Sequence, residues 1–511
     1  MLTYRTIALC LATGVLTTTR PLDVAAELAT ASPPDAEQPF SFDRLVARAE
    51  KMAGSKHQPP VAAPPAFAQL TYDRYRMISP RFEKARWRDE DLPFWLEPHH
   101  AGFLFPFGKR LNEVGRDEAE GQSTEQIPFD PALFQYRGSA APLADTPGGA
   151  YAGFRLLTRL LDRPNPQEFL SFLGASYFRV LGAFDWYGAS VRGLAIDVGL
   201  GSPEEFPRFI EFWIERPEDK NKITVWALLD GPAVAGAYQF EVFPGETTRV
   251  AVTCALFFRH GVQKVGVAPI TSMWMWEAWS KPSDDPRPEV HDSDGLLIEA
   301  SGRWTWRPLV RADRTVVSSF PTDALAGFGL MQRDREYENY ADNEARYHLR
   351  PNVWVKPRGD WGAGRVELLE LSSTHEGFDN IGAYWVPAEP VRGGQRHDFR
   401  YELSFGQREP EGNYQARFAH TIPRATQQGS SYFLVLEGGD ELPNLERNNV
   451  EPVINVEGGS VGEVRFEKQP DNNWVLSFDL HHDPASPVTA TAEIHADGRP
   501  VSETWSYTWT P

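Results

Sequence analysis

The chain has 511 residues, of which 41% are hydrophobic and 12% aromatic, so it is long enough to bury the cores of two domains. Its formal net charge of −19 at pH 7, without a block of lysines and arginines, argues against nucleic acid as a partner, because phosphate backbones bind cationic surfaces. The 41 glycines and 42 prolines, with many β-branched and aromatic residues, predict a mostly β protein.

The first 26 residues have the pattern of a secretory signal peptide. Arg5 supplies a positive charge, residues 6–16 form an apolar stretch, and residues 24–26 offer a cleavage site. The apolar stretch is too short to span a bilayer, which needs about 20 residues. An apolar disordered tail is the alternative interpretation. We expect export beyond the inner membrane, no membrane-spanning segment, and a mature chain whose one cysteine is Cys254.

A disordered lead-in and a short helix are expected next. Residues 27–40 are rich in Ala, Pro and Glu and lack the apolar content of a packed segment. Ser41 is then a suitable N-cap, apolar residues recur at helical spacing, and Gly54 stops the pattern. We interpret this helix as packing on the first domain, without a role in chemistry.

Strand-like segments dominate from about residue 94 onwards. They are residues 191–198, 209–215, 223–229, 249–258, 304–309, 328–332, 353–356, 366–371 and 381–386. In residues 249–258 apolar side chains occupy every second position, which makes Cys254 a core residue and not a nucleophile. So many strands predict a large antiparallel β-sandwich at residues 41–386.

A second, smaller domain is predicted after residues 387–396, where two prolines and two glycines interrupt the strands. We assign that segment as a linker. Residues 397–511 are predicted to form an immunoglobulin-like β-sandwich, although the Cys…Trp…Cys pattern of antibody domains is absent. The strands that support this prediction are 399–405, 464–468, 474–480 and 489–496.

Residues 268–297 combine aromatic and acidic side chains in a way that is typical of carbohydrate sites. Three indoles offer flat apolar faces for sugar rings: Trp274, Trp276 and Trp279. They are followed by groups that can transfer protons at a glycosidic bond: Glu289, His291, Asp292 and Asp294. The structural alternative is that the tryptophans belong to a core and that the acidic residues form a turn.

Patterns for nucleotide and metal chemistry are absent from the sequence. It contains no Walker loop, dinucleotide-binding fingerprint, HExxH or CxxC. Residues 292–295, Asp-Ser-Asp-Gly, resemble part of a calcium loop, but the glycine comes two positions too early and no Glu occupies the twelfth position. We therefore expect neither a metal ion nor a cofactor.

A second acidic group, Glu376 and Asp379, precedes a strand that contains Tyr384. A carboxylate at such a junction is held on a rigid scaffold and stays within reach of a substrate, which suits a general acid. Asp379 is equally consistent with a turn residue, and its separation from Asp292 along the chain says nothing about their distance in space. Further polar candidates, which a surface ion-pair network or structural histidines would also explain, are residues 333–336, Tyr347, His348 and Arg350.

Seven phrases of the sequence together resemble those of one protein family. They are GASYFRV at 174–180, VRGLAID at 191–197, EFPRF at 205–209, EFWIER at 211–216, PEVHDSDG at 288–295, GFGL at 327–330 and DNI at 379–381. In this order they resemble the periplasmic glucan biosynthesis family, whose members are called the G and D proteins. The resemblance extends from about residue 40 to the predicted domain boundary, and less distinctly through the second domain.

The resemblance implies an exported Gram-negative protein of the periplasm, with a large mutarotase-like β-sandwich and a small immunoglobulin-like domain. It implies work on osmoregulated periplasmic glucans, whose backbone is β-1,2-linked glucose, by an inverting endo-type glycoside hydrolase. Carried over onto this sequence, the acid is Asp379 and the base is Asp292. The residues implied or considered as substrate-binding or proton-relay contacts are Glu376, Tyr347, Arg350, His291, Trp274, Trp276 and Tyr384.

The sequence departs from the family pattern in its export signal. Several members carry twin arginines, whereas Arg5 stands alone, which favours the G-like branch or a divergent one. Gly382, Ala383 and the short loop at residues 276–280 are differences that bear on the shape of the cleft. Two alternative functions are therefore kept: a non-catalytic glucan-binding or assembly protein, and a β-1,2-glucan transglycosylase. A second copy of the chain, in a homodimer, is a further candidate partner.

Overall fold

The computed structural model describes residues 39–117, 121–310, 314–412, 414–426, 429–438, 450–470, 473–483 and 485–509. The predicted signal peptide at residues 1–26 lies outside the described residues, as does the predicted lead-in at 27–40 except for its last two residues. The fold is mostly β, as predicted. Within the described ranges, no helix has the length and apolar character needed to cross a bilayer.

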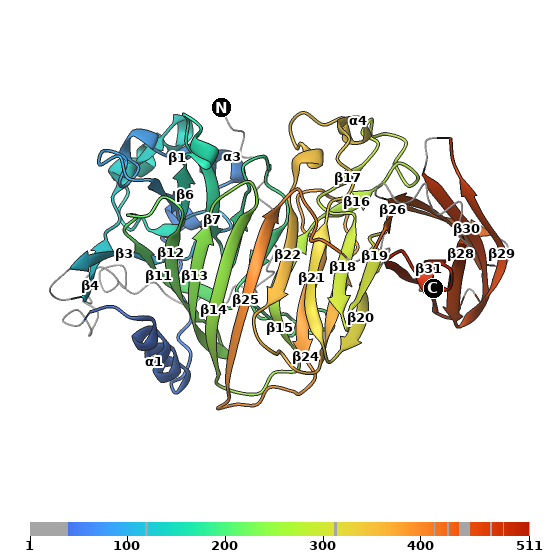
Figure 1. Ribbon diagram of the computed structural model, residues 1–511. Coiled ribbons are helices and arrows are strands. Elements are labelled where there is room, and N and C mark those ends of the chain that lie inside the picture. Colours follow the sequence, from blue (N-terminus) through green and yellow to red (C-terminus); the bar gives the residue numbers. More distant parts are fainter. Residues whose placement is uncertain are drawn as a thin grey trace.

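Two large, mostly antiparallel sheets pack face to face and form the main β-sandwich (Figure 1). The first sheet has the order β2 (Phe94–His100), β6 (Tyr151–Thr158), β7 (Gln167–Leu173), β8 (Tyr177–Val180), β9 (Ser190–Arg192), β15 (Val265–Ser272), β24 (Ile381–Pro387), β23 (Gly364–Glu370) and β20 (Val316–Thr322), and β10 (Leu194–Ile196) pairs with β15. The main-body part of the second sheet has the order β19 (Arg303–Pro308), β18 (Gly295–Ala300), β21 (Leu325–Met331), β22 (Asn352–Pro357), β25 (Arg396–Gly406), β14 (Thr248–Phe258), β13 (Val234–Phe243), β12 (Ile223–Asp230), β11 (Arg208–Glu215), β3 (Arg110–Asp117) and β4 (Gly121–Ile127).

Phenylalanine side chains fill the space between the two sheets. The ring centroid of Phe154 on β6 lies 5.2 Å from that of Phe212 on β11, and Phe172 on β7 lies 5.3 Å from Phe240 on β13. Burying each such ring stabilises the fold by about 1.5–3 kcal/mol. The period-two pattern predicted for residues 249–258 is confirmed by β14, and Cys254 is buried in this core.

The predicted N-terminal helix is present as α1 (Phe42–Ala53). Ser41 caps it, because its hydroxyl accepts a hydrogen bond from the backbone N–H of Arg44 at 3.3 Å. Leu45 and Ala49 are buried against the side of β12, β13 and β14 that faces away from the phenylalanine core (Figure 1). The helix therefore covers part of the sandwich and lies outside its interior.

A smaller β-sandwich, here called the C-terminal body, follows the main one (Figure 1). One of its layers consists of β26 (Ala416–Thr426), β27 (Gly429–Gly438), β30 (Trp474–His482) and β29 (Gly459–Lys468). The other layer consists of β28 (Val450–Glu457), β31 (Val488–Ala496), β32 (Arg499–Pro500) and β33 (Thr504–Trp509). β33 pairs in parallel with β19 of the main body, with Trp505 opposite Trp306, so the two bodies share a continuous sheet.

The strand at residues 399–405 does not belong to the second domain in which we expected it. It is part of β25, which lies between β14 and β22 in the main sheet, with Tyr401 opposite Val252 and Leu403 opposite Val355. Residues 388–395, which we predicted to lie in a linker, connect β24 to β25 within the main body. Prolines and glycines mark a turn between strands as readily as a linker between domains, so the sequence could not separate the two.

Candidate active site

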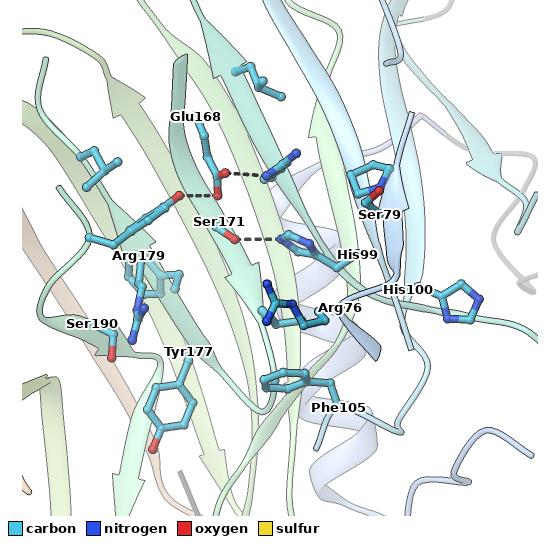
Figure 2. A pocket seen from close by; sticks show the side chains of 18 of the residues that line it. Arg76, Ser79, His99, His100, Phe105, Glu168, Ser171, Tyr177, Arg179 and Ser190 are labelled. Atoms are coloured by element: carbon cyan, nitrogen blue, oxygen red, sulfur yellow. Dashed lines mark hydrogen bonds and ion pairs between the residues drawn. The ribbon is translucent and has the colours of Figure 1, made fainter. Parts of the chain in front are cut away.

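A cavity of about 860 Å³ opens on the ten-stranded sheet (Figure 2). His99 of β2, Ser171 of β7 and Arg179 of β8 line it, whereas the adjacent Phe172 and Val180 are buried in the phenylalanine core. This arrangement follows from the alternation of side chains along a strand, which places polar residues on one face and apolar residues on the other. The volume lies within the range of about 300–1,000 Å³ that is usual for ligand sites.

A network of hydrogen bonds lines one wall of this cavity (Figure 2). Glu168 accepts from Arg155 Nη1 at 2.8 Å and from the hydroxyl of Tyr187. The Nε2 atom of His99 lies 2.9 Å from the hydroxyl of Ser171. Burial, helped by the charge of Arg155, lowers the pKa of His99 to about 3, so its imidazole is neutral at pH 7. A wall of paired charges and neutral donors and acceptors suits the hydroxyl groups of a sugar.

Asp379 lies on the same cavity, in the loop that connects β23 to β24. Its Oδ2 accepts a long hydrogen bond of 3.5 Å from the hydroxyl of Ser190 on β9. The next residue, Asn380, anchors the loop: its amide exchanges two hydrogen bonds of 2.9 Å with the backbone of Trp274 and donates a third, of 3.1 Å, to the carbonyl of Leu371. The half-buried carboxyl group is thus held on the sheet while it faces the cavity.

We expect Asn380→Ala to lower the free energy of unfolding by about 2 kcal/mol, because it leaves the buried N–H and C=O groups of Trp274 without their partners. Chemical denaturation measures the effect. Asn343→Ala, which truncates an exposed side chain, is the matched control and should change the stability little. Equal stability of the two variants would show that the amide of Asn380 does not anchor the loop.

Asp292, immediately after β17 (Val290–His291), is buried. Its Oδ1 accepts a hydrogen bond from Nη1 of Arg350, and its backbone N–H donates to the carbonyl of Met273 at 2.7 Å. Burial raises the pKa of Asp292 to about 6, the charge of Asp379 contributes to the rise, and Arg350 opposes it. The two aspartates, far apart in the sequence, therefore lie close enough in space for the charge of Asp379 to act on the ionisation of Asp292.

A hydrogen bond between Glu376 and Tyr347 links the loop that carries Asp379 to the turn that precedes Arg350. The hydroxyl of Tyr347, at the start of the 3₁₀ turn η6 (Tyr347–Leu349), donates to Glu376 Oε2 at 3.0 Å. Nη1 of Arg287 donates to the same carboxylate oxygen at 2.7 Å. The guanidinium of Arg350 lies over the ring of Tyr347, 4.3 Å from its centroid. The fold thus brings five of the predicted site residues together: Asp292, Asp379, Glu376, Tyr347 and Arg350.

His291 is fully buried and is not among the residues that line the cavity. Its ring nitrogens lie 3.1 Å from Gln332 Oε1 and 3.2 Å from Glu289 Oε2. Burial by itself would lower the pKa of His291, but the carboxylates of Asp294 and Glu289 outweigh it and raise the pKa to about 10. The imidazole is therefore a buried cation in a hydrogen-bonded network and does not line the cavity.

Trp274, Trp276 and Tyr384 lie away from the lining of the main cavity. The two tryptophans form β16 (Trp274–Trp276), are buried, and line a separate pocket of about 200 Å³ beside Asn380. Tyr384 is fully buried on β24, in a cluster with Leu369 and other apolar residues. The described residues include no group of three or more His, Cys, Asp or Glu side chains arranged to hold a metal ion.

Several residues of the cavity wall were not predicted from the sequence. Besides Glu168 and His99, they include Trp186, whose half-buried ring lines the cavity and lies 4.6 Å from the guanidinium of Arg346. These residues come from separate strands and loops, so no local motif unites them. The one available signal was the alternation of polar and apolar residues in β7, which indicated a polar face without showing what it bounds.

The chain matches the family described as "Periplasmic glucan biosynthesis protein, MdoG" over residues 40–509. It is 40% identical over 503 residues to glucans biosynthesis protein D 1 of Ralstonia nicotianae, with 93% of this chain and 92% of the relative covered. It is 39% identical over 485 residues to glucans biosynthesis protein G of Rhodopseudomonas palustris, with 93% and 95% covered. Identity to D and G relatives is thus nearly equal and favours neither branch. The chain belongs to the periplasmic glucan biosynthesis protein family.

Proposed function

We propose that this protein hydrolyses the β-1,2-linked backbone of a periplasmic glucan, as an inverting endo-β-1,2-glucanase with Asp379 as acid and Asp292 as base. The observation that supports it most directly is a pair of interacting aspartates: Asp379 lines the cavity, and its charge contributes to the raised pKa of the buried Asp292. Proton transfer uses carboxyl groups whose pKa is shifted toward the working pH, and such shifted groups cluster at catalytic sites. The family supplies the glucan and the periplasmic location.

The positions of the two carboxyl groups suggest their roles. Asp379 faces the cavity and can donate its proton to the glycosidic oxygen as the bond from C1 to that oxygen breaks. Asp292 accepts a proton from the water whose oxygen bonds to C1 from the opposite face of the ring.

The pKa of Asp292 suits a base better than an acid at neutral pH. A carboxyl group with a pKa of about 6 is roughly 90% ionised at pH 7, and a base is most effective when its pKa lies just below the working pH. Arg350 stabilises the ionised form, and Tyr347, whose pKa is raised by burial, keeps its proton and donates to Glu376. The groups around the two aspartates thus hold a proton-transfer path in a fixed arrangement.

One experiment with the wild-type protein tests the proposal. Purified protein is incubated with linear β-1,2-glucan, while reducing ends, product size and the anomer formed first are followed by colorimetry, chromatography and proton NMR. We expect new reducing ends, shorter chains and the α-anomer as the initial product. Shortened or cyclic chains without new reducing ends would indicate a transglycosylase, and unchanged glucan would indicate a binding or assembly protein; either result overturns the proposal.

A further inference from the structure

The guanidinium of Arg333 is buried where the main body meets the C-terminal body. Its nitrogens donate to Glu503 at 2.6 and 2.9 Å and to Glu409 at 3.0 and 3.2 Å. Nη1 also donates to the carbonyl of Phe418 on β26 at 2.6 Å, and the guanidinium carbon lies 3.5 Å from the centroid of the Trp306 ring. The side chains of Arg333 and Glu503 are 1% and 0% exposed, so this ion pair is shielded from water.

The backbone of Arg333 holds the segment that carries Asp292. The N–H groups of Arg333 and Asp334 both donate to Asp294 Oδ2, the second of them at 2.9 Å. Asp294 stands two residues after Asp292, and its own N–H donates to the carbonyl of Met331 at 2.7 Å. One residue therefore binds the C-terminal body through its side chain and the neighbourhood of the proposed base through its backbone.

Arg335 holds the other member of the Asp292–Arg350 pair. Its Nη1 donates to the backbone carbonyl of Arg350 at 2.9 Å and to that of His348 at 3.1 Å. Its Nη2 donates to Asn352 Oδ1 at 3.1 Å. Residues 333–335, here called the clamp, thus contact the base segment, the turn that carries Arg350, and the C-terminal body.

From these contacts we infer that the C-terminal body positions the Asp292–Arg350 pair through the clamp, and that Glu503 and Glu409 are positioning residues for the reaction. The inference rests on the proposed function and extends it to a domain whose described residues contribute no side chain to the cavity lining. The physical reason is that a buried guanidinium needs both carboxylates. When one is lost, the guanidinium shifts toward other acceptors, and the backbone that holds Asp294 shifts with it.

The test uses Glu503→Gln and the less buried Glu409→Gln in the full chain, because the second variant keeps the inference testable if the first fails to fold. Each should lower kcat on β-1,2-glucan about tenfold with KM within about twofold of wild type. The low-pH limb of the rate profile should move upward by roughly half a pH unit. This limb reflects the ionisation of Asp292, whose pKa depends on the charges of Arg350, Asp379, Arg179 and His291. An Arg350 that is held less closely stabilises the ionised form of Asp292 less, so the pKa of Asp292 rises.

Asp479→Asn is the matched control. It removes a carboxylate that accepts a hydrogen bond from Ser431 inside the C-terminal body, away from Arg333, and should leave kcat and the pH limb unchanged. A role in stability alone would lower the melting temperature of the two Glu variants but leave kcat per folded molecule and the pH limb as in wild type; that result overturns the inference. The two proposals fail separately, because a wild-type protein without hydrolytic activity refutes the proposed function, whereas active wild type with unaffected variants refutes only the positioning role.

Discussion

Asp379→Asn is expected to lower the rate of β-1,2-glucan hydrolysis by roughly a thousandfold, because an amide cannot supply the proton that the leaving oxygen needs. The affinity for glucan should change little. Asparagine has nearly the same shape, and the loop is anchored by Asn380, whereas among the described contacts Asp379 itself accepts only the long hydrogen bond from Ser190. Initial rates from reducing ends give kcat, and calorimetric titration with linear glucan gives Kd.

Asp360→Asn is the control for this variant, since Asp360 is an exposed carboxylate in the turn between β22 and β23. It should hydrolyse and bind glucan like wild type. Hydrolysis at the wild-type rate by Asp379→Asn would mean that the proton comes from another group, as in a binding protein or a different enzyme. A variant that loses binding and thermal stability together would instead assign Asp379 a structural role.

Much of the fold could be predicted from local patterns, because those patterns have local causes. The N-cap at Ser41 and the alternation in residues 249–258 correspond to α1 and β14, each formed by interactions within a few residues or by one buried face. The same alternation in residues 399–405 predicted a strand correctly but not its sheet. The pairing partners of a strand depend on the whole core, and β25 pairs with strands that lie about 50 and 150 residues earlier in the chain.

The site shows the same division between local and long-range information. Asp292 and Asp379 could be selected only through a resemblance to known sequences, since neither spacing nor composition indicates that the ionisation of one affects the other. The tryptophans near Asp292 had the composition of a sugar platform, but Trp274 and Trp276 pair with β17 and are buried. Trp186, in a segment without a motif, lies at the cavity. Composition identifies a residue type and not the direction of its side chain.

Asp292→Asn should abolish hydrolysis and at the same time make the protein more stable at neutral pH. Loss of the proposed base is expected to cost at least a thousandfold in kcat. The stability effect follows from the native pKa of about 6, which exceeds the ordinary value of 3.8. The native state thus holds this proton more tightly than the unfolded chain. The stabilising contribution of the protonated group is present in full below pH 3.8 and is lost as the pH rises through about 6.

Asparagine does not ionise in this pH range, so the stability of the variant does not fall as the pH rises through about 6. Relative to wild type, its free energy of unfolding should increase by about 2 kcal/mol between about pH 4.5 and about pH 7.5, as measured by denaturant titration at both pH values. Asp360→Asn should show no such dependence on pH. A constant difference between variant and wild type would mean that Asp292 ionises with an ordinary pKa. If the fold keeps this buried charge because the reaction needs it, the variant should lose activity. It should also gain stability only at pH values at which the wild-type carboxyl group is ionised.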